Sequence, residues 1–184
     1  MEPQYFERTF RRGLTAGAAI VEMQEVGFVQ FSQFIGIGTR DLGSCSVVVI
    51  VSHNAAILAH IAPRSNANPT DIHAGDINAR QMMRRVQQVF HDNRDYFTTS
   101  AGHMLCAIFA GRIALPDQLE IIRQHLYQLG LQPSIDHYHV PSDGRQGRGT
   151  VMILGPRHAR TPGYVEVYME DYRVARYPCP PSPA

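Results

Sequence analysis

The feature that most constrains the fold is an almost unbroken run of β-branched apolar residues at positions 46–51, Ser-Val-Val-Val-Ile-Val. Such residues favour strands, and a strand without polar alternation is typical of one buried on both faces. Ser-His-Asn at positions 52–54 indicates a turn, and Ala-Ala-Ile-Leu-Ala-His-Ile at 55–61 returns before Pro63 ends the run. The sequence therefore predicts a hairpin whose first strand lies in the middle of a sheet.

The remaining pattern places strands and helices around this hairpin. Apolar residues recur at helical spacing within 76–90 and 117–129, which predicts two helices. Gly36 and Gly38 interrupt the strand pattern just before Thr39. Further strands are expected at residues 19–23, 27–35, 103–110, 134–140, 150–154 and 163–169. This order is typical of an α+β fold, a single-domain sandwich of mostly antiparallel sheet with two main helices packed against it.

The length of 184 residues suits one domain with a sizeable core. We expect that domain to span residues 18–172. Residues 1–17 carry several arginines and few apolar positions, which predicts an irregular lead-in. Residues 173–184 are rich in proline and are expected to form a poorly ordered tail.

The composition bears on partners and location. The formal net charge of +1 gives no reason to expect binding to nucleic acid or to an anionic membrane. No apolar run approaches the roughly 20 residues that span a bilayer, so no membrane insertion is expected. Residues 1–10 lack the apolar core of a secretory signal, which predicts a cytoplasmic protein. The pattern makes no prediction about the oligomeric state.

Three cysteines occur, Cys45, Cys106 and Cys179. An odd number at irregular spacing is not typical of a disulfide framework and fits free thiols in a reducing compartment. Cys106 lies in an apolar run and is expected to pack as a small hydrophobic residue, while Cys179 lies in the proline-rich end. Only Cys45, set among small residues before the apolar strand, has the surroundings of a site.

The segment that ends at Cys45 begins at Thr39 and reads Thr-Arg-Asp-Leu-Gly-Ser-Cys. If Ser52 and His53 are the two turn residues of the hairpin, Cys45 lies directly opposite His60, with Cβ atoms about 4.5 to 5.5 Å apart. An adjacent imidazolium lowers the pKa of a thiol, and the thiolate is the nucleophile. The Thr39 hydroxyl could accept a hydrogen bond from the second ring nitrogen of His60 and hold its tautomer.

Gly43 and Ser44 are candidates for contact with a substrate. Glycine lets the backbone approach a substrate closely. Backbone amides from Gly43 to Cys45 could point at a developing oxyanion. The pattern alone leaves another interpretation open, in which Cys45 packs in the core and His60 is a capped or surface residue.

These residues resemble the CheD family of chemoreceptor glutamine deamidases. The family carries a threonine, then Leu-Gly-Ser-Cys, an apolar strand and Ala-His, which here are Thr39, residues 42–45 and Ala59-His60. The resemblance continues through 107–111 and 147–151 and covers about residues 27–170. The same Cys-His arrangement is shared with glutamine-deamidating toxins such as cytotoxic necrotizing factor.

The resemblance implies a cysteine-dependent hydrolase that deamidates glutamine side chains, through a thioester intermediate and without cofactor or metal. It implies that Cys45 is the nucleophile, His60 the general base and acid, and Thr39 the residue that orients His60. The implied partner is a protein with an accessible glutamine. Two alternatives are another Cys-His acyl-transfer enzyme, of the transglutaminase or thiol protease type, and a catalytically silent module that docks a signalling protein.

Three segments depart from the family pattern. Ile57-Leu58 and Ala110-Gly111 stand where the family has glycine pairs, and Asp-His-Tyr-His at 136–139 replaces Asp-x-Gly-Gly. These positions lie near the substrate groove in the family, which implies an altered substrate surface. His137 and His139 would put two imidazoles on one face of a strand, but no convincing third ligand accompanies them, so no metal site is predicted.

Overall fold

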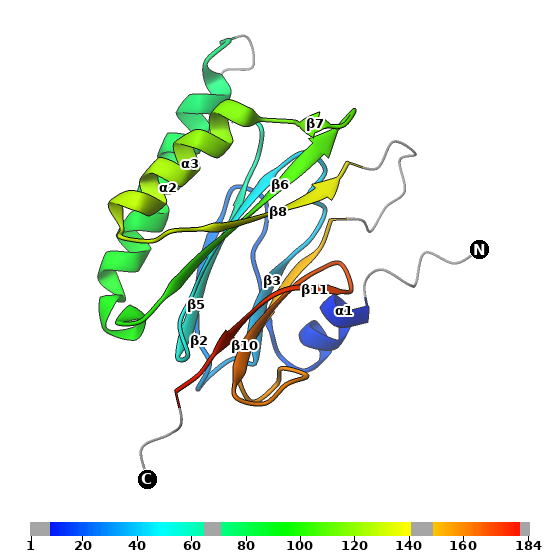
Figure 1. The fold of residues 1–184 in the computed structure, drawn as a ribbon, viewed down its shortest axis with the longest axis vertical. Helices are drawn as coiled ribbons and strands as arrows, with labels where there is room; N and C mark the ends of the chain where they lie inside the picture. The colour runs from blue at the N-terminus through cyan, green and yellow to red at the C-terminus, as the bar shows by residue number, and fades with distance from the viewer. Residues whose placement is uncertain (1–7, 65–70, 141–148, 181–184) are drawn as a thin grey trace, which may run out of the picture.

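The computed structural model describes residues 8–64, 71–140 and 149–180. Two β-sheets lie face to face, and helices cover their outer faces (Figure 1). Sheet I follows the order β2-β5-β4-β6, and both β7 and β8 pair with β6. Its strands are β2 Val26–Gln30, β4 Ser46–Val51, β5 Ala55–Ile61, β6 Ala101–Phe109, β7 Arg112–Ile113 and β8 Ser134–His139.

Sheet II follows the order β1-β3-β9-β10-β11. Its strands are β1 Ala19–Ile20, β3 Gly36–Thr39, β9 Val151–Leu154, β10 Tyr164–Met169 and β11 Tyr172–Pro178. Pairing is antiparallel except between β1 and β3 and between β6 and β8. The predicted α+β sandwich of mostly antiparallel sheet is confirmed.

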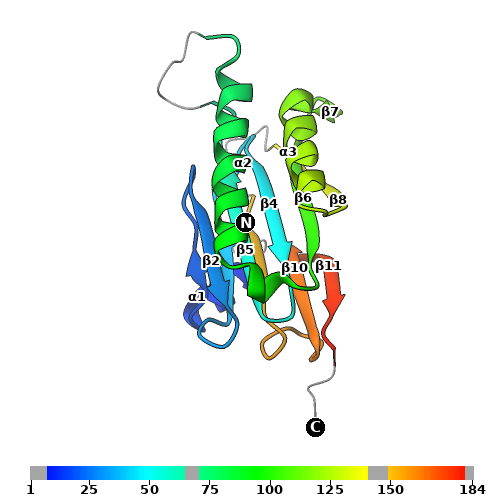
Figure 2. The same ribbon diagram turned by 90° about the vertical axis from the view of Figure 1, so that its left-hand side faces the viewer.

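Two long helices, α2 (Ala74–Asp92) and α3 (Pro116–Gln128), pack on the outer face of sheet I (Figure 2). A 3₁₀ turn, Arg94–Phe97, follows α2. The apolar stripes of both helices meet the outward-facing side chains of β4 and β5. This outer cluster includes Val48, Ile50, Ile57, Ile61, Met83, Val86, Ile122 and Leu126. Within the described residues, no helix is long and apolar enough to cross a membrane.

The opposite face of β4 and β5 packs against sheet II. The cluster between the sheets includes Val47, Val49, Val51, Leu58, Ile37, Ile153 and Val167. Every residue of β4 and β5 is buried, as the apolar run predicts. Each fully buried valine or isoleucine stabilises the fold by about 1.5 to 3 kcal/mol relative to exposure, so the central hairpin contributes strongly to the core.

Residues 8–15 form a helix, α1 (Arg8–Thr15), where the sequence predicts an irregular lead-in. Phe10 is buried with Met152 on the outer face of sheet II. The Asp171 carboxylate accepts a hydrogen bond from the Thr9 amide at 2.8 Å, and so satisfies an amide of the first helical turn. The prediction is wrong because the contacts that stabilise α1 come from distant parts of the chain.

The predicted strand 27–35 is also wrong in its second half. β2 is shorter than expected, and the chain turns before β3 joins sheet II. Gly36 and Gly38 therefore lie inside a strand instead of ending one. A Cβ at Gly36 would lie 2.0 Å from the carbonyl oxygen of Ile153, so the close pairing of β3 with β9 requires glycine.

The expected C-terminal tail begins later than predicted. Strand β11 pairs antiparallel with β10 as far as Pro178 and forms the edge of sheet II. Val174 and Ala175 pack against the cluster between the sheets, which holds this segment in place. The glycine-rich segment at 141–148 and the last residues, 181–184, lie outside the described residues.

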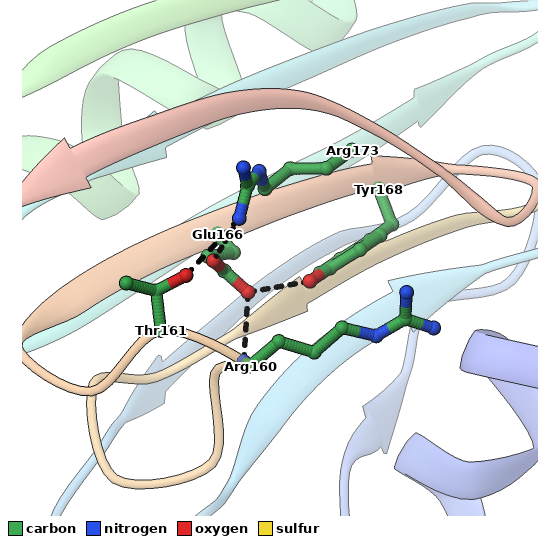
Figure 3. A network of polar contacts seen from close by, with 5 residues as sticks. All are labelled: Arg160, Thr161, Glu166, Tyr168 and Arg173. Atoms are coloured by element: carbon green, nitrogen blue, oxygen red, sulfur yellow. Dashed lines mark hydrogen bonds and ion pairs between the residues drawn. The ribbon is translucent and has the colours of Figure 1, made fainter.

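A buried carboxylate on β10 links several parts of sheet II (Figure 3). Glu166 is fully buried and accepts hydrogen bonds from the Tyr168 hydroxyl and, at 2.8 Å, from the Arg160 amide. Arg173 lies 2.7 Å from its other oxygen, and Thr161 donates as well. Burial raises the pKa of Glu166, but these hydrogen bonds outweigh burial and leave the pKa below its usual value.

We expect Tyr168→Phe to lower the free energy of unfolding by about 1 to 3 kcal/mol, because it leaves a buried charge without one donor. Urea denaturation measures the change, with Tyr172→Phe as the control because Tyr172 is 67% exposed. The pKa of Glu166 is lower in the folded protein than in the unfolded chain. Ionised Glu166 therefore stabilises the fold at pH values above its pKa in the unfolded chain, and this stabilisation is lost as the pH falls through its pKa in the folded protein. A loss no greater than that of the control would contradict this role.

Candidate active site

The turn of the β4–β5 hairpin lies one residue later than predicted. The Ser52 hydroxyl accepts hydrogen bonds from the amides of Asn54 and Ala55, both at 3.1 Å. The Ser52 amide also donates to the Ala55 carbonyl at 2.9 Å. These contacts make His53 and Asn54 the two turn residues, and they move the register of the whole hairpin.

The shifted register changes the partner of His60. His60 lies opposite Val47, so the prediction that Cys45 lies directly opposite it is wrong by two residues. A shift of two residues keeps every side chain on its face, because the side-chain period of a strand is two. Cys45 lies one residue before β4, and continuing the register by that residue would make it a diagonal neighbour of His60 on the same face. Diagonal neighbours have Cβ atoms about 7 Å apart, and no hydrogen bond joins these two side chains in the structure as described.

The ring of His60 is held by Thr39 on sheet II. His60 Nδ1 lies 2.8 Å from Thr39 Oγ1, which lies 2.7 Å from the Val21 carbonyl oxygen. A hydroxyl has one proton and a carbonyl oxygen only accepts, so Thr39 donates to Val21 and accepts from His60 Nδ1. This network assigns the ring proton to Nδ1 and leaves a lone pair on Nε2. The structure thus brings Thr39 and His60 together in the relation expected from the sequence.

The other ring nitrogen of His60 is buried and unpaired. His60 is 1% exposed, and its Nε2 has no hydrogen-bond partner among the described residues. Buried polar atoms are nearly always paired, so an unpaired nitrogen deserves a specific explanation. A neutral imidazole with a free Nε2 lone pair can accept a proton, which is the property required of a general base.

The main chain at His60 is fixed by the turn between β1 and β2. The Gln24 amide donates to the His60 carbonyl at 2.8 Å, and the His60 amide donates to the Glu25 carbonyl at 3.1 Å. The Gln24 side chain in turn accepts from the Ala62 amide and from Asn78 of α2, both at 3.0 Å. Sequence reasoning missed Gln24, because it lies outside the motif and acts through residues that are distant in the chain.

Cys45 and His60 are both neutral at rest. Burial raises the pKa of Cys45 to about 11. Burial lowers the pKa of His60 to about 4, although the Asp41 carboxylate acts in the opposite direction. At neutral pH the pair is therefore a thiol and an imidazole. The expectation of a thiolate stabilised by an imidazolium does not describe this resting state.

The turn before Cys45 presents two free backbone amides. The Cys45 amide donates to the Leu42 carbonyl at 2.7 Å, so it is not available to an oxyanion. The amides of Gly43 and Ser44 have no acceptor among the residues that the structure describes. Asp41 and Gly43 have φ values of 57° and 52°, and a Cβ at Gly43 would meet nothing within 4 Å. The role of the Gly43 and Ser44 amides as donors to an oxyanion therefore stays a prediction.

Tyr138 is a residue of the site that the sequence did not reveal. It lies on β8, is 4% exposed, and donates its hydroxyl to the carbonyl oxygen of Cys45. His137 and His139, on either side of it, are exposed, and the described part of the chain holds no group of three residues able to bind a metal. The alternation of side-chain faces along this strand could have indicated that Tyr138 points into the core. Its partner could not have been predicted, because it is a backbone atom that no sequence pattern indicates.

A second buried histidine lies elsewhere between the sheets. His103 lies on β6 and is 1% exposed. Its Nε2 lies 3.0 Å from the Asp136 carboxylate, and its Nδ1 lies 3.2 Å from the Tyr177 hydroxyl on β11. Burial lowers the pKa of His103, and the Asp136 charge raises it. This cluster connects β6 and β8 with β11.

A scan against models of known protein families finds no match for this chain, and a search of curated proteins finds none either. The resemblance to the CheD family therefore rests on the residues quoted above, and the roles it implies stay predictions. The geometry adds one independent observation, the Thr39–His60 hydrogen bond, and a register that places Cys45 on the face of His60 when it is continued one residue beyond β4.

We expect Tyr138→Phe to destabilise the protein by about 1 to 3 kcal/mol, because the buried Cys45 carbonyl loses its partner. Chemical denaturation measures this loss. Tyr127→Phe is a suitable control, because Tyr127 is 52% exposed on α3. Equal stability of the two variants would show that the Tyr138 contact does not hold the Cys45 turn.

The resting state of Cys45 can be tested by alkylation with iodoacetamide. With a thiol pKa of about 11, the rate should rise about tenfold per pH unit between pH 7 and pH 10, since only the thiolate reacts. Mass spectrometry of the Cys45 peptide measures the rate, and Cys45→Ser identifies the signal. A rate that stays constant over this range would indicate a thiolate already formed by ion pairing with His60.

Proposed function

We propose that this protein is a cysteine-dependent hydrolase that converts glutamine side chains of a protein substrate to glutamate and releases ammonia. The observation that carries this proposal is the ring of His60, held by Thr39 with Nε2 unpaired, on the same face as Cys45. The free amides of Gly43 and Ser44 add donors beside the nucleophile. A nucleophile, a base, an orienting group and oxyanion donors are the four parts that acyl-transfer chemistry needs.

The first half of the reaction forms a thioester. His60 Nε2 accepts the Cys45 thiol proton while Sγ bonds to the carbon of the substrate carboxamide. The carbonyl oxygen becomes an oxyanion, which accepts hydrogen bonds from the Gly43 and Ser44 amides. The protonated His60 then donates to the amide nitrogen, the C–N bond breaks, and ammonia leaves. Because the resting pair is neutral, proton transfer accompanies attack and does not precede it.

The second half hydrolyses the thioester. His60 is neutral again after ammonia leaves, and its Nε2 accepts a proton from a water molecule that attacks the thioester carbon. The tetrahedral intermediate collapses, the C–S bond breaks, and His60 returns its proton to Cys45. The product is a glutamate side chain. Throughout, Thr39 keeps the Nδ1 proton in place, so the same nitrogen serves both half-reactions.

The proposed substrate is a protein with an accessible glutamine, since the family that the site resembles acts on proteins. The proposal places the reaction in the cytoplasm, because a reducing compartment suits a catalytic thiol and free cysteines. The departures at Ala110-Gly111 and at residues 136–139, which include exposed residues, support a substrate other than a chemoreceptor, whereas Ile57 and Leu58 are fully buried and do not form a substrate surface.

A second candidate is a catalytically silent module that docks a signalling protein. The observation in its favour is the high pKa of Cys45 together with an exposure of 4%, because a structural buried cysteine has the same properties. The transglutaminase and protease alternatives use the same Cys45–His60 pair and differ only in the acceptor or in the bond cleaved.

We expect the protein to release ammonia from a panel of glutamine-containing proteins and to convert specific glutamines to glutamate, read by mass spectrometry. Cys45→Ala should abolish both signals. An added fluorescent primary amine tests the alternatives, because its incorporation would identify transglutamination, and shortened fragments would identify proteolysis. Ammonia release that persists in Cys45→Ala would exclude the proposed nucleophile, and its absence from the wild type across the panel would favour the silent module.

The role of Thr39 has a matched pair of variants. Thr39→Val keeps the shape but removes the acceptor for Nδ1, so kcat should fall by about 100-fold as the ring loses its fixed tautomer. Thr39→Ser retains the hydroxyl and should keep most of the activity. Equal kcat values for the two variants would show that the hydroxyl does not orient His60.

A further inference from the structure

A pocket of about 150 Å³ lies on the outer face of sheet II, between α1, the end of β9 and the segment that follows it. It is lined by Thr9, Arg12, Gly13, Ala16, Ile35, Leu154, His158 and Arg160. Thr39 belongs to sheet II as well, but its side chain points between the sheets to His60, whereas Leu154 belongs to the outer cluster. The pocket is therefore separate from the candidate active site.

The polar lining of this pocket is basic. Arg12 comes from α1, and His158 and Arg160 come from the segment after β9. Among the described residues, no acidic side chain lines it. Two guanidinium groups at one small pocket favour an anion, because the planar guanidinium forms paired hydrogen bonds with carboxylates and phosphates.

Arg160 is fixed in position without being neutralised by an acid. Its amide donates to Glu166, but its guanidinium lies 5.3 Å from the centre of the Tyr168 ring and donates to Thr9 Oγ1 at 3.3 Å. Figure 3 shows the Arg160 side chain extending away from Glu166, whose second oxygen is taken by Arg173. In the part of the chain that the structure describes, no carboxylate pairs with the Arg160 guanidinium, so its charge is not neutralised by a described residue.

The rest of the lining is apolar and favours a ligand with a hydrocarbon part. Gly13, Ala16, Ile35 and Leu154 offer no hydrogen-bonding side chain. A cavity of about 150 Å³ holds a molecule of about six heavy atoms, the size of benzene. A fully polar anion such as phosphate would leave this apolar surface uncovered, whereas a carboxylic acid with a short hydrocarbon chain would cover it.

We propose that this pocket binds a short-chain carboxylic acid, with its carboxylate at Arg12 and Arg160 and its hydrocarbon chain over Ile35 and Leu154. The Thr9–Arg160 hydrogen bond and the Tyr168 ring preorganise one of the two guanidinium groups for the ligand. The proposal does not depend on any activity of Cys45, because the two sites lie on opposite faces of sheet II.

Isothermal titration calorimetry with butyrate tests this proposal, with butyramide as the uncharged isostere. We expect saturable binding of butyrate at one site and none of butyramide. Arg160→Gln and Arg12→Gln should each weaken binding by at least about tenfold through loss of charge-assisted hydrogen bonds. Arg157→Gln is the matched control, because Arg157 is exposed in the same segment but does not line the pocket. Cys45→Ala should bind butyrate as the wild type does.

Several results would overturn the proposal. They include a failure of butyrate to bind saturably, an equal affinity for butyrate and butyramide, and an equal weakening of butyrate binding by Arg157→Gln and Arg160→Gln. Binding of inorganic phosphate in preference to butyrate would overturn the carboxylate class. Circular dichroism of each variant confirms folding, and a misfolded glutamine variant is replaced by Arg160→Lys. That variant keeps the charge but loses the paired hydrogen bonds, so it should still bind more weakly than wild type, and unchanged affinity would overturn the proposal.

Discussion

The burial of β4 and β5 on both faces is the constraint on which the rest of the structure depends. A hairpin covered by helices on one side and by a second sheet on the other gives its side chains no access to solvent. A polar group in this hairpin must therefore find a partner inside the protein. His60 meets this demand with one nitrogen through Thr39 and leaves the other unpaired. The candidate base is thus a direct consequence of where the hairpin lies.

The same burial decides the charge state of the candidate nucleophile and base. Removing a thiol and an imidazole from water disfavours the charged form of each, which raises the pKa of Cys45 and lowers that of His60. A neutral pair suits a reaction in which proton transfer and attack occur together. The Thr39 hydroxyl, which is uncharged, orients the ring without adding a charge that would stabilise the imidazolium. A site in which a buried carboxylate orients the histidine differs, because the carboxylate adds a negative charge that stabilises the imidazolium.

Much of the candidate site could be predicted from the sequence, because its residues lie in or beside a strongly patterned hairpin. The prediction that Cys45 and His60 share a face did not depend on the exact register. An error of two residues leaves each side chain on its face, because the side-chain period of a strand is two. Gly43 and Ser44 could be marked by their position before the cysteine. Tyr138 and Gln24 could not be predicted, because each acts on a backbone atom of a residue far away in the chain.

The fold was also predictable only in part. The central hairpin and both long helices were expected from the sequence. Helix α1 and strand β11 were missed, because contacts with distant parts of the chain stabilise them.

The sequence by itself determined the α+β class and the buried hairpin, because apolar periodicity and turn residues are properties of neighbouring positions, and it predicted a site of Cys45, His60 and Thr39. The tertiary structure alone decided the tautomer of His60, the neutral state of the pair and the choice of free amides at Gly43 and Ser44. It alone also brought Arg12 to Arg160 across the outer face of sheet II. These properties depend on desolvation and on contacts between segments far apart in the chain, and no local pattern specifies either.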